Sequence, residues 1–132
     1  MGYRVTRILL DTHALIWWLE GGVKLSAAAR LAISNSAETV LVSAASAWEI
    51  AIKQQAGKFR VPDLVKDFQG RIQKEGFVEL PISIEHAVRA GALPGSHKDP
   101  FDRVLIAQSQ VENAAMVTRD SVFRKYAVQC IW

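Results

Sequence analysis

Four acidic residues in this chain lie at positions where α/β enzymes place catalytic residues. They are Asp11, Glu49, Asp102 and Asp120. Two of them, Asp11 and Asp120, come just after apolar segments that are typical of strands, and the other two lie within the first two turns of expected helices. Carboxylates held close together repel one another unless a cation lies between them. The pattern therefore indicates a site for a divalent metal ion.

The residue types around these acids narrow the choice of metal and reaction. Oxygen-only ligands favour Mg²⁺ or Mn²⁺ over zinc, and the three histidines and the single cysteine offer no soft or imidazole ligand set. A metal ion held by carboxylates activates a bound water and neutralises charge on phosphate oxygens. The chain has neither a GxxxxGK[ST] nor a GxGxxG motif, so a phosphate-loop nucleotide site is not expected. Phosphodiester hydrolysis is the chemistry that this set favours.

The acids depend for their position on a repeated strand–helix order. Strands are expected near residues 7, 40, 78, 115 and 128, with helical patterns between most of them. The run Ile8-Leu9-Leu10 is wholly apolar, which is typical of a strand buried on both faces of a parallel sheet. Ligands bind at the carboxyl ends of such strands. We expect a single domain over residues 1–132, with an α/β fold of three layers and a five-stranded, mainly parallel sheet.

Capping patterns predict the helix starts. Ser26, Ser43 and Ser83 precede helical patterns, and one long helix is expected from Pro62 to near Gly76. Asp99 before Pro100 is an N-cap followed by proline at the first helical position, so capping alone explains Asp99. Asp102 lies at the third helical position, on the other side, where capping does not explain it.

Two features of the chain allow two interpretations each. Glu49 and Lys53 stand one helical turn apart, and such a pair taken alone is usually a solvated surface pair. Trp17 and Trp18 are adjacent on a helix and cannot both point into one core. Either one of them is partly exposed and belongs to a partner surface, or both pack under neighbouring loops.

Composition limits the class of protein. The 132 residues carry a formal charge of +3, which fits a nucleic-acid partner without requiring one. The lone Cys130 excludes an internal disulfide and suits a reducing cytoplasm. No apolar run approaches the roughly 20 residues that span a bilayer, and no signal-peptide pattern opens the chain. We expect a cytoplasmic protein without a membrane partner.

Four segments of the chain together resemble PIN-domain ribonucleases of the VapC type, the toxins of bacterial type II toxin–antitoxin systems. The resemblance runs over nearly the whole chain in the order of the family. The segments are LLDTHALIW (9–17), SAASAWEIAIK (43–53), HKDPFDR (97–103) and VTRD (117–120).

The resemblance implies a fold, an activity and partners. The fold is a PIN domain, and Asp11, Glu49, Asp102 and Asp120 are the catalytic acids that bind Mg²⁺ or Mn²⁺. Asp102 rather than Asp99 matches the third acid of the family, and the fourth position is the least essential. The activity is metal-dependent cleavage of RNA by an endoribonuclease. The partners are an RNA substrate, a cognate VapB-type antitoxin whose tail fills the active groove, and a second copy in a homodimer.

Two other classes of protein use related arrangements of acids. A receiver-like signalling domain also holds Mg²⁺ at strand ends, but it needs paired acids after the first strand and a lysine after the last. Here Thr12 follows Asp11, and the last strand runs into Ile131-Trp132. An inactive PIN-like interaction domain would keep the four acids only by accident.

Overall fold

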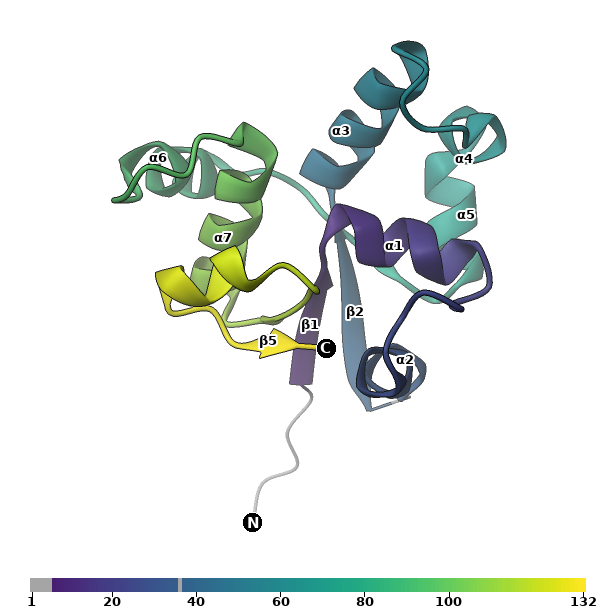
Figure 1. The fold of residues 1–132 in the computed structure, drawn as a ribbon, viewed down its shortest axis with the longest axis horizontal. Helices are drawn as coiled ribbons and strands as arrows, with labels where there is room; N and C mark the ends of the chain where they lie inside the picture. The colour runs from purple at the N-terminus through teal and green to yellow at the C-terminus, as the bar shows by residue number, and fades with distance from the viewer. Residues whose placement is uncertain (1–5, 36) are drawn as a thin grey trace.

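A five-stranded sheet forms the centre of the computed structural model, which describes residues 6–35 and 37–132 (Figure 1). The strand order is β3-β2-β1-β4-β5, and each pair of neighbouring strands is parallel. The expected α/β fold with five strands is therefore confirmed, and parallel pairing extends to every described strand. The strands are β1 (Thr6–Leu10), β2 (Glu38–Ser43), β3 (Val78–Leu80), β4 (Ala115–Val117) and β5 (Cys130–Ile131).

Helices cover both faces of this sheet. They are α1 (Thr12–Leu19), α2 (Ala27–Ser34), α3 (Ala44–Gln55), α4 (Pro62–Lys66), α5 (Phe68–Lys74), α6 (Ile84–Ala92), α7 (Pro100–Glu112) and a 3₁₀ helix η1 (Ser121–Tyr126). Alternate residues of the central strand face opposite layers, because strand side chains alternate between faces. Ile8 and Leu10 pack with α1, α2 and α5, whereas Leu9 packs with α7 and η1. The fold thus has three layers, as Figure 1 shows.

The direction of strand order reverses at β1. From β1 the chain first builds β2 and β3 on one side, and later β4 and β5 on the other. In open parallel sheets, ligands bind at the point where the order reverses in this way, because the connections diverge there. Asp11 lies at this point, and its backbone N–H donates to the carbonyl oxygen of Val117 at 3.1 Å.

The segment from Pro62 to Gly76 differs from its expected single helix. It forms two helices, α4 and α5, that meet at Asp67. The Asp67 side chain accepts a hydrogen bond from the backbone N–H of Gly70 at 3.1 Å and so caps α5. A short acidic side chain that bonds nearby backbone competes with continued helix, which explains the break.

The other expected boundaries hold more closely. Ser26, Ser43, Ser83 and Asp99 each accept a hydrogen bond from a backbone N–H in the first turn of the helix they precede. The last strand is shorter than the expected range 128–131. In the described ranges, no helix combines the length and the apolar character needed to cross a membrane.

Candidate active site

Asp11 is positioned by two elements at once. It follows β1, and its Oδ1 accepts a hydrogen bond from the backbone N–H of Ala14 at 2.8 Å, which makes it the N-cap of α1. The residue is buried, and burial raises the pKa of its carboxyl group above the ordinary value. Hydrogen bonds from Thr118 and Ala14 oppose this shift, and the charge of Asp120 adds to it. An ionised Asp11 is therefore held in a place where a cation would stabilise it.

Glu49 faces inward from α3, next to the residue that follows Asp11. Its exposed fraction is only 5%, and its Oε1 accepts a hydrogen bond from the Thr12 hydroxyl at 2.7 Å. The other oxygen, Oε2, pairs with Lys53 Nζ at 2.5 Å. The ion pair with Lys53 exists, but the interpretation of a solvated surface pair is wrong because Glu49 is buried. Thr12 also lies 3.1 Å from the Ser46 hydroxyl, so α1 and α3 are joined by a buried polar cluster.

Asp102 and Asp99 have separate roles at the start of α7. Asp99 Oδ1 accepts the backbone N–H of Asp102 at 3.0 Å, which confirms its capping role. Asp102 Oδ2 lies 2.9 Å from Nε2 of His97. Burial raises the pKa of Asp102 to about 6, and the charges of Asp99 and Glu49 add to this, while the hydrogen bond from His97 opposes it.

Asp120 is exposed and caps the 3₁₀ helix η1 by accepting the backbone N–H of Val122 at 3.0 Å. Together with Asp11 it borders a cavity of about 320 Å³. The cavity is lined by Asp11, His13, Trp17, Arg119 and Asp120, which we call the Trp17 pocket. Of the four predicted acids, Asp120 lies near enough to Asp11, and Glu49 near enough to Asp102, for its charge to raise the pKa of that neighbour.

These donors fit a hard divalent cation by their chemistry. They are oxygen ligands, two of them have raised pKa values, and Mg²⁺ is usually held by one or two carboxylates with waters and substrate phosphate. Among residues 6–35 and 37–132, no three His, Cys, Asp or Glu side chains are arranged around one metal position. The side chains therefore fit an ion held partly by water, rather than a closed protein cage.

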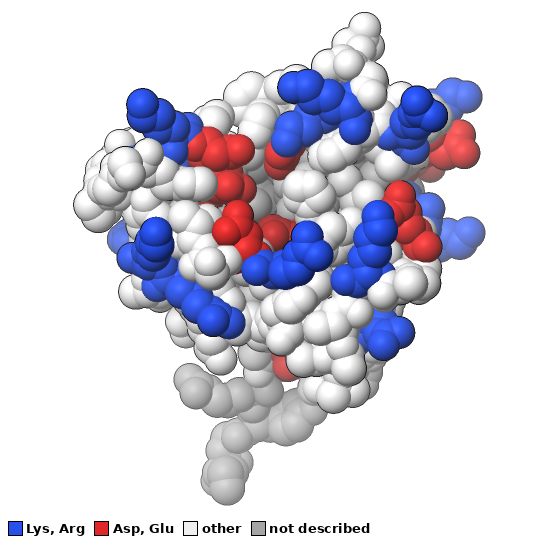
Figure 2. Space-filling model, in the orientation of Figure 1, with Lys and Arg blue, Asp and Glu red and all other residues white. Residues whose placement is uncertain are grey.

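Basic side chains surround the acids. Figure 2 shows Asp and Glu gathered near the centre of one face, with Lys and Arg around them. A second cavity, of about 660 Å³, is lined by His97, the residue that contacts Asp102. Lys98, Lys125 and Tyr126 also line this cavity. A basic rim around an acidic centre attracts a polyanion while leaving the centre free for a metal ion.

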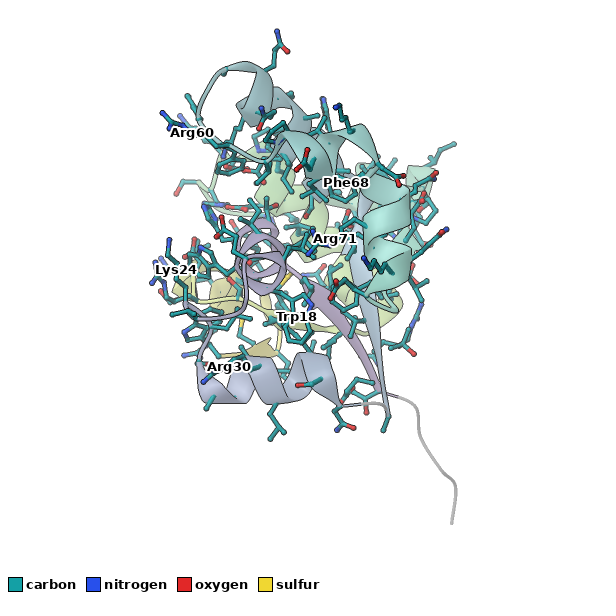
Figure 3. The ribbon with its side chains drawn as sticks, turned by 90° about the vertical axis from the view of Figure 1, so that its right-hand side faces the viewer. Trp18, Lys24, Arg30, Arg60, Phe68 and Arg71 are labelled. Carbon is teal, nitrogen blue, oxygen red and sulfur yellow. The ribbon has the colours of Figure 1, made fainter. Side chains whose placement is uncertain are left out.

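Of the two interpretations of Trp17 and Trp18, the structure favours the one in which both pack against the rest of the domain. Trp17 and Trp18 are both half-buried and pack against the core. Trp18 Nε1 donates to Glu75 at 2.8 Å. Figure 3 shows Trp18 with Arg71 along the side formed by α1 and α5, while Lys24, Arg30 and Arg60 project toward the face drawn in Figure 2. The exposed tryptophan is instead Trp48 on α3, at 57%.

Three residues near the site carry roles that the sequence reasoning did not assign. Thr12 bonds Glu49, Thr118 bonds Asp11, and His97 bonds Asp102. Thr12 and Thr118 lie at strand ends close to the acids in the sequence. A hydroxyl in that position could have been predicted to donate a hydrogen bond to one of them. The contact between His97 and Asp102 could not be predicted from the sequence, because it depends on the conformation of the loop before α7.

Comparisons with known proteins agree with this geometry. The family model described as PIN domain matches residues 8–129. Ribonuclease VapC22 of Mycobacterium tuberculosis (strain ATCC 25618 / H37Rv) is 31% identical over 127 residues, which cover 92% of this chain and 93% of that protein.

Solved structures share the fold. The VapBC2 complex of Rickettsia felis, bound to a promoter DNA fragment, matches with a TM-score of 0.68 at 14% identity, over 95% of this chain and 97% of that chain. The structure of FitAcB from Neisseria gonorrhoeae matches with a TM-score of 0.55 at 17% identity, over 93% and 95%. With the family model, the sequence relative and the fold in agreement, this chain belongs to the PIN-domain family.

Proposed function

We propose that this protein is a Mg²⁺- or Mn²⁺-dependent endoribonuclease that acts as the toxin of a toxin–antitoxin pair. The observation that carries the proposal is the presence of two acids whose pKa values are raised by burial, Asp11 where the strand order reverses and Asp102 in the first turn of α7. The similarity to ribonuclease VapC22 supports the choice of RNA as substrate. The acids proposed as catalytic metal ligands are Asp11, Glu49, Asp102 and Asp120.

The chain's own residues would divide the work. Asp11, Glu49, Asp102 and Asp120 would hold the metal ion, directly or through bound water. The bound ion would supply an activated water and neutralise charge on the phosphate that is attacked. Thr12 and Lys53 orient Glu49, and the basic side chains around the acids would bind RNA phosphates and bring the strand to them.

The proposal includes partners and a location. We propose a VapB-type antitoxin as inhibitor, because an antitoxin arginine placed among Asp11, Glu49 and Asp102 would take over the charge role of the metal. The structural neighbours are toxin–antitoxin complexes, which supports a partner of this kind. We further propose a homodimer, and action in the cytoplasm, where RNA substrates are found.

A cleavage assay tests the proposed function. The purified protein is incubated with a single-stranded RNA in Mn²⁺, in Mg²⁺ and in EDTA, and the products are separated on a denaturing gel. We expect internal cleavage with either metal and none in EDTA. Cleavage that persists in EDTA would reject metal dependence. No cleavage of any RNA tested, with metal binding intact, would favour the inactive interaction domain.

A further inference from the structure

We propose that the Trp17 pocket is a subsite for one nucleotide of a single-stranded RNA, in which Arg119 binds a phosphate and His13 stacks an unpaired base. This inference rests on the proposed ribonuclease function and names how the substrate is held beside Asp11 and Asp120. It follows from three features of the pocket: a restrained cation, an exposed ring and a volume suited to one nucleotide.

The cation is Arg119. The guanidinium carbon Cζ lies 4.9 Å from the centroid of the Trp17 ring, while the residue itself is exposed. Stacking on an aromatic face restrains the guanidinium plane and leaves the N–H groups in that plane available for phosphate oxygens. Asp11 and Asp120 line the same pocket, yet no ion pair within the described ranges uses Arg119. The cation is thus held in place and free to bind an anion.

The exposed ring is His13. Its ring centroid lies 5.5 Å from that of Trp17 and 5.9 Å from that of Phe59, with the Phe59 ring nearly perpendicular. Contacts on two sides fix the imidazole, although the residue is exposed to solvent. A fixed, exposed ring is the kind of platform on which an unstacked RNA base rests.

The size and position of the pocket select the substrate class. A volume of about 320 Å³ is at the lower end for small-molecule sites, so it suits one nucleotide and not a helical groove. A base can reach His13 only when it is free of pairing and stacking. With its phosphate on Arg119, the adjoining phosphodiester lies beside Asp11 and Asp120. The subsite therefore favours single-stranded RNA over duplex RNA.

Binding in EDTA tests the subsite apart from cleavage. The probe is a fluorescein-labelled, mixed-sequence RNA of about ten nucleotides, followed by fluorescence anisotropy. We expect Arg119→Gln to weaken binding about tenfold and to reduce the slope of log K against log salt by about 0.7, the value for one lost phosphate contact. We expect His13→Ala to weaken binding by fivefold or more, and His13→Phe to restore it, because stacking needs a ring and no charge.

Arg89→Gln is the matched control. Arg89 is an exposed arginine that donates to Gln110, which lies about 12 Å along α7 from Asp102 at 1.5 Å per residue. We expect its affinity and salt slope to match the wild type. Equal effects of Arg89→Gln and Arg119→Gln, failure of His13→Phe to restore binding, or equal affinity for a duplex of the same length would each overturn the subsite.

Failure of the subsite and failure of the nuclease give different results. If the wild type binds RNA through Arg119 and His13 but cleaves none, the subsite stands and the proposed nuclease function fails. If the wild type cleaves RNA and Arg119→Gln changes neither affinity nor KM, the subsite is overturned and the nuclease stands. If Arg119→Gln weakens only the binding of an antitoxin, the pocket is a protein-binding site and the proposal is wrong.

Discussion

Asp11 combines a structural and a chemical role in one carboxylate. Its Oδ1 caps α1, and its side chain is buried beside the exposed Asp120. Capping needs only an acceptor oxygen, whereas metal binding needs negative charge. The two roles can therefore be separated by removing the charge while an oxygen is kept.

The first prediction uses this separation. Asp11→Asn retains an amide oxygen for the Ala14 N–H, and asparagine is among the best N-caps. We expect ribonuclease activity to fall by at least about 100-fold, since even changes behind a metal ligand cost 10- to 100-fold. We expect the melting temperature of the metal-free protein to stay equal or rise, because a buried charge near Asp120 is removed. Full activity with added Mg²⁺ would show that Asp11 is not a ligand.

The second prediction contrasts Asp99 with Asp102, one helical turn apart. Asp99→Ala removes the oxygen that accepts the Asp102 N–H, and we expect a loss of about 1 kcal/mol in the free energy of unfolding. Asp102→Ala should abolish activity with little effect on melting. Denaturant unfolding and the RNA cleavage assay on both variants check this pair. Asp99→Asn is the control, because it retains the cap and should unfold like the wild type.

The third prediction concerns pH. The pKa of Asp102 in the folded protein is raised from 3.8 to about 6, so the folded state binds more protons than the unfolded state between these values. The contribution of Asp102 to stability therefore falls as the pH rises through this window, and metal binding needs the ionised form. We expect Mn²⁺ affinity, measured by calorimetry, to weaken as the pH falls below about 6. If the Mn²⁺ affinity does not change between pH values above and below about 6, Asp102 is not a metal ligand.

At the scale of elements, Arg103 ties the α6–α7 connection to α7. Its guanidinium donates to the carbonyl oxygens of Ala90 at 3.0 Å, Leu93 at 2.7 Å and His97 at 2.9 Å. His97 in turn pairs with Asp102. The planar group with several donors thus holds a connection that has little regular structure of its own.

The fourth prediction is that Arg103→Lys is not conservative. A lysine amine cannot donate to several carbonyl groups at once as the planar guanidinium does, so partly buried carbonyl oxygens lose their hydrogen-bond donors. We expect a loss of about 2 kcal/mol or more in the free energy of unfolding, and a rise in KM for RNA as His97 and Lys98 lose their positions. Arg89→Lys, which gives up one exposed contact, is the control for urea unfolding. Equal midpoints for the two variants would show that the connection holds without Arg103.

At the scale of the whole molecule, α3 and α6 each present two large apolar side chains to solvent. Trp48 and Ile52 on α3 are 57% and 46% exposed, and Ile84 and Val88 on α6 are 83% and 66% exposed. Exposed apolar surface of this kind marks interfaces, and most soluble homo-oligomers are two-fold dimers. The proposed homodimer would cover one of these two faces.

The fifth prediction tests the dimer and its face. Light scattering on the purified chain should give roughly twice the 14.6 kDa of one chain. Two double variants are compared: Trp48→Ala with Ile52→Ala on α3, and Ile84→Ser with Val88→Ser on α6. We expect one of them to shift the measured mass toward that of a single chain. The other, on the face that the dimer does not use, then serves as the control. A single-chain mass at every concentration would reject the homodimer.

Local patterns in the sequence predicted most of the helices and strands, and they identified the four candidate acids. Examples are the apolar run before Asp11, the serine caps and the helix start at Asp99-Pro100. These features depend on residues within one or two helical turns, so they can be predicted without knowledge of the tertiary structure. The helix break at Asp67 was missed, although an Asp three residues before Gly70 can cap a helix there. The metal and the substrate stay predictions, because carboxylates at strand ends limit the class of ion but do not show it bound.

The tertiary structure decided which surfaces meet. Pairing of β4 beside β1 brings Leu10 next to Val117, and this register places Thr118 and Asp120 beside Asp11. Packing of α3 against α1 buries Glu49 and leaves Trp48 in solvent. The physical reason is that strand order and burial depend on contacts between residues far apart in the chain, whereas helical spacing and caps depend only on near neighbours.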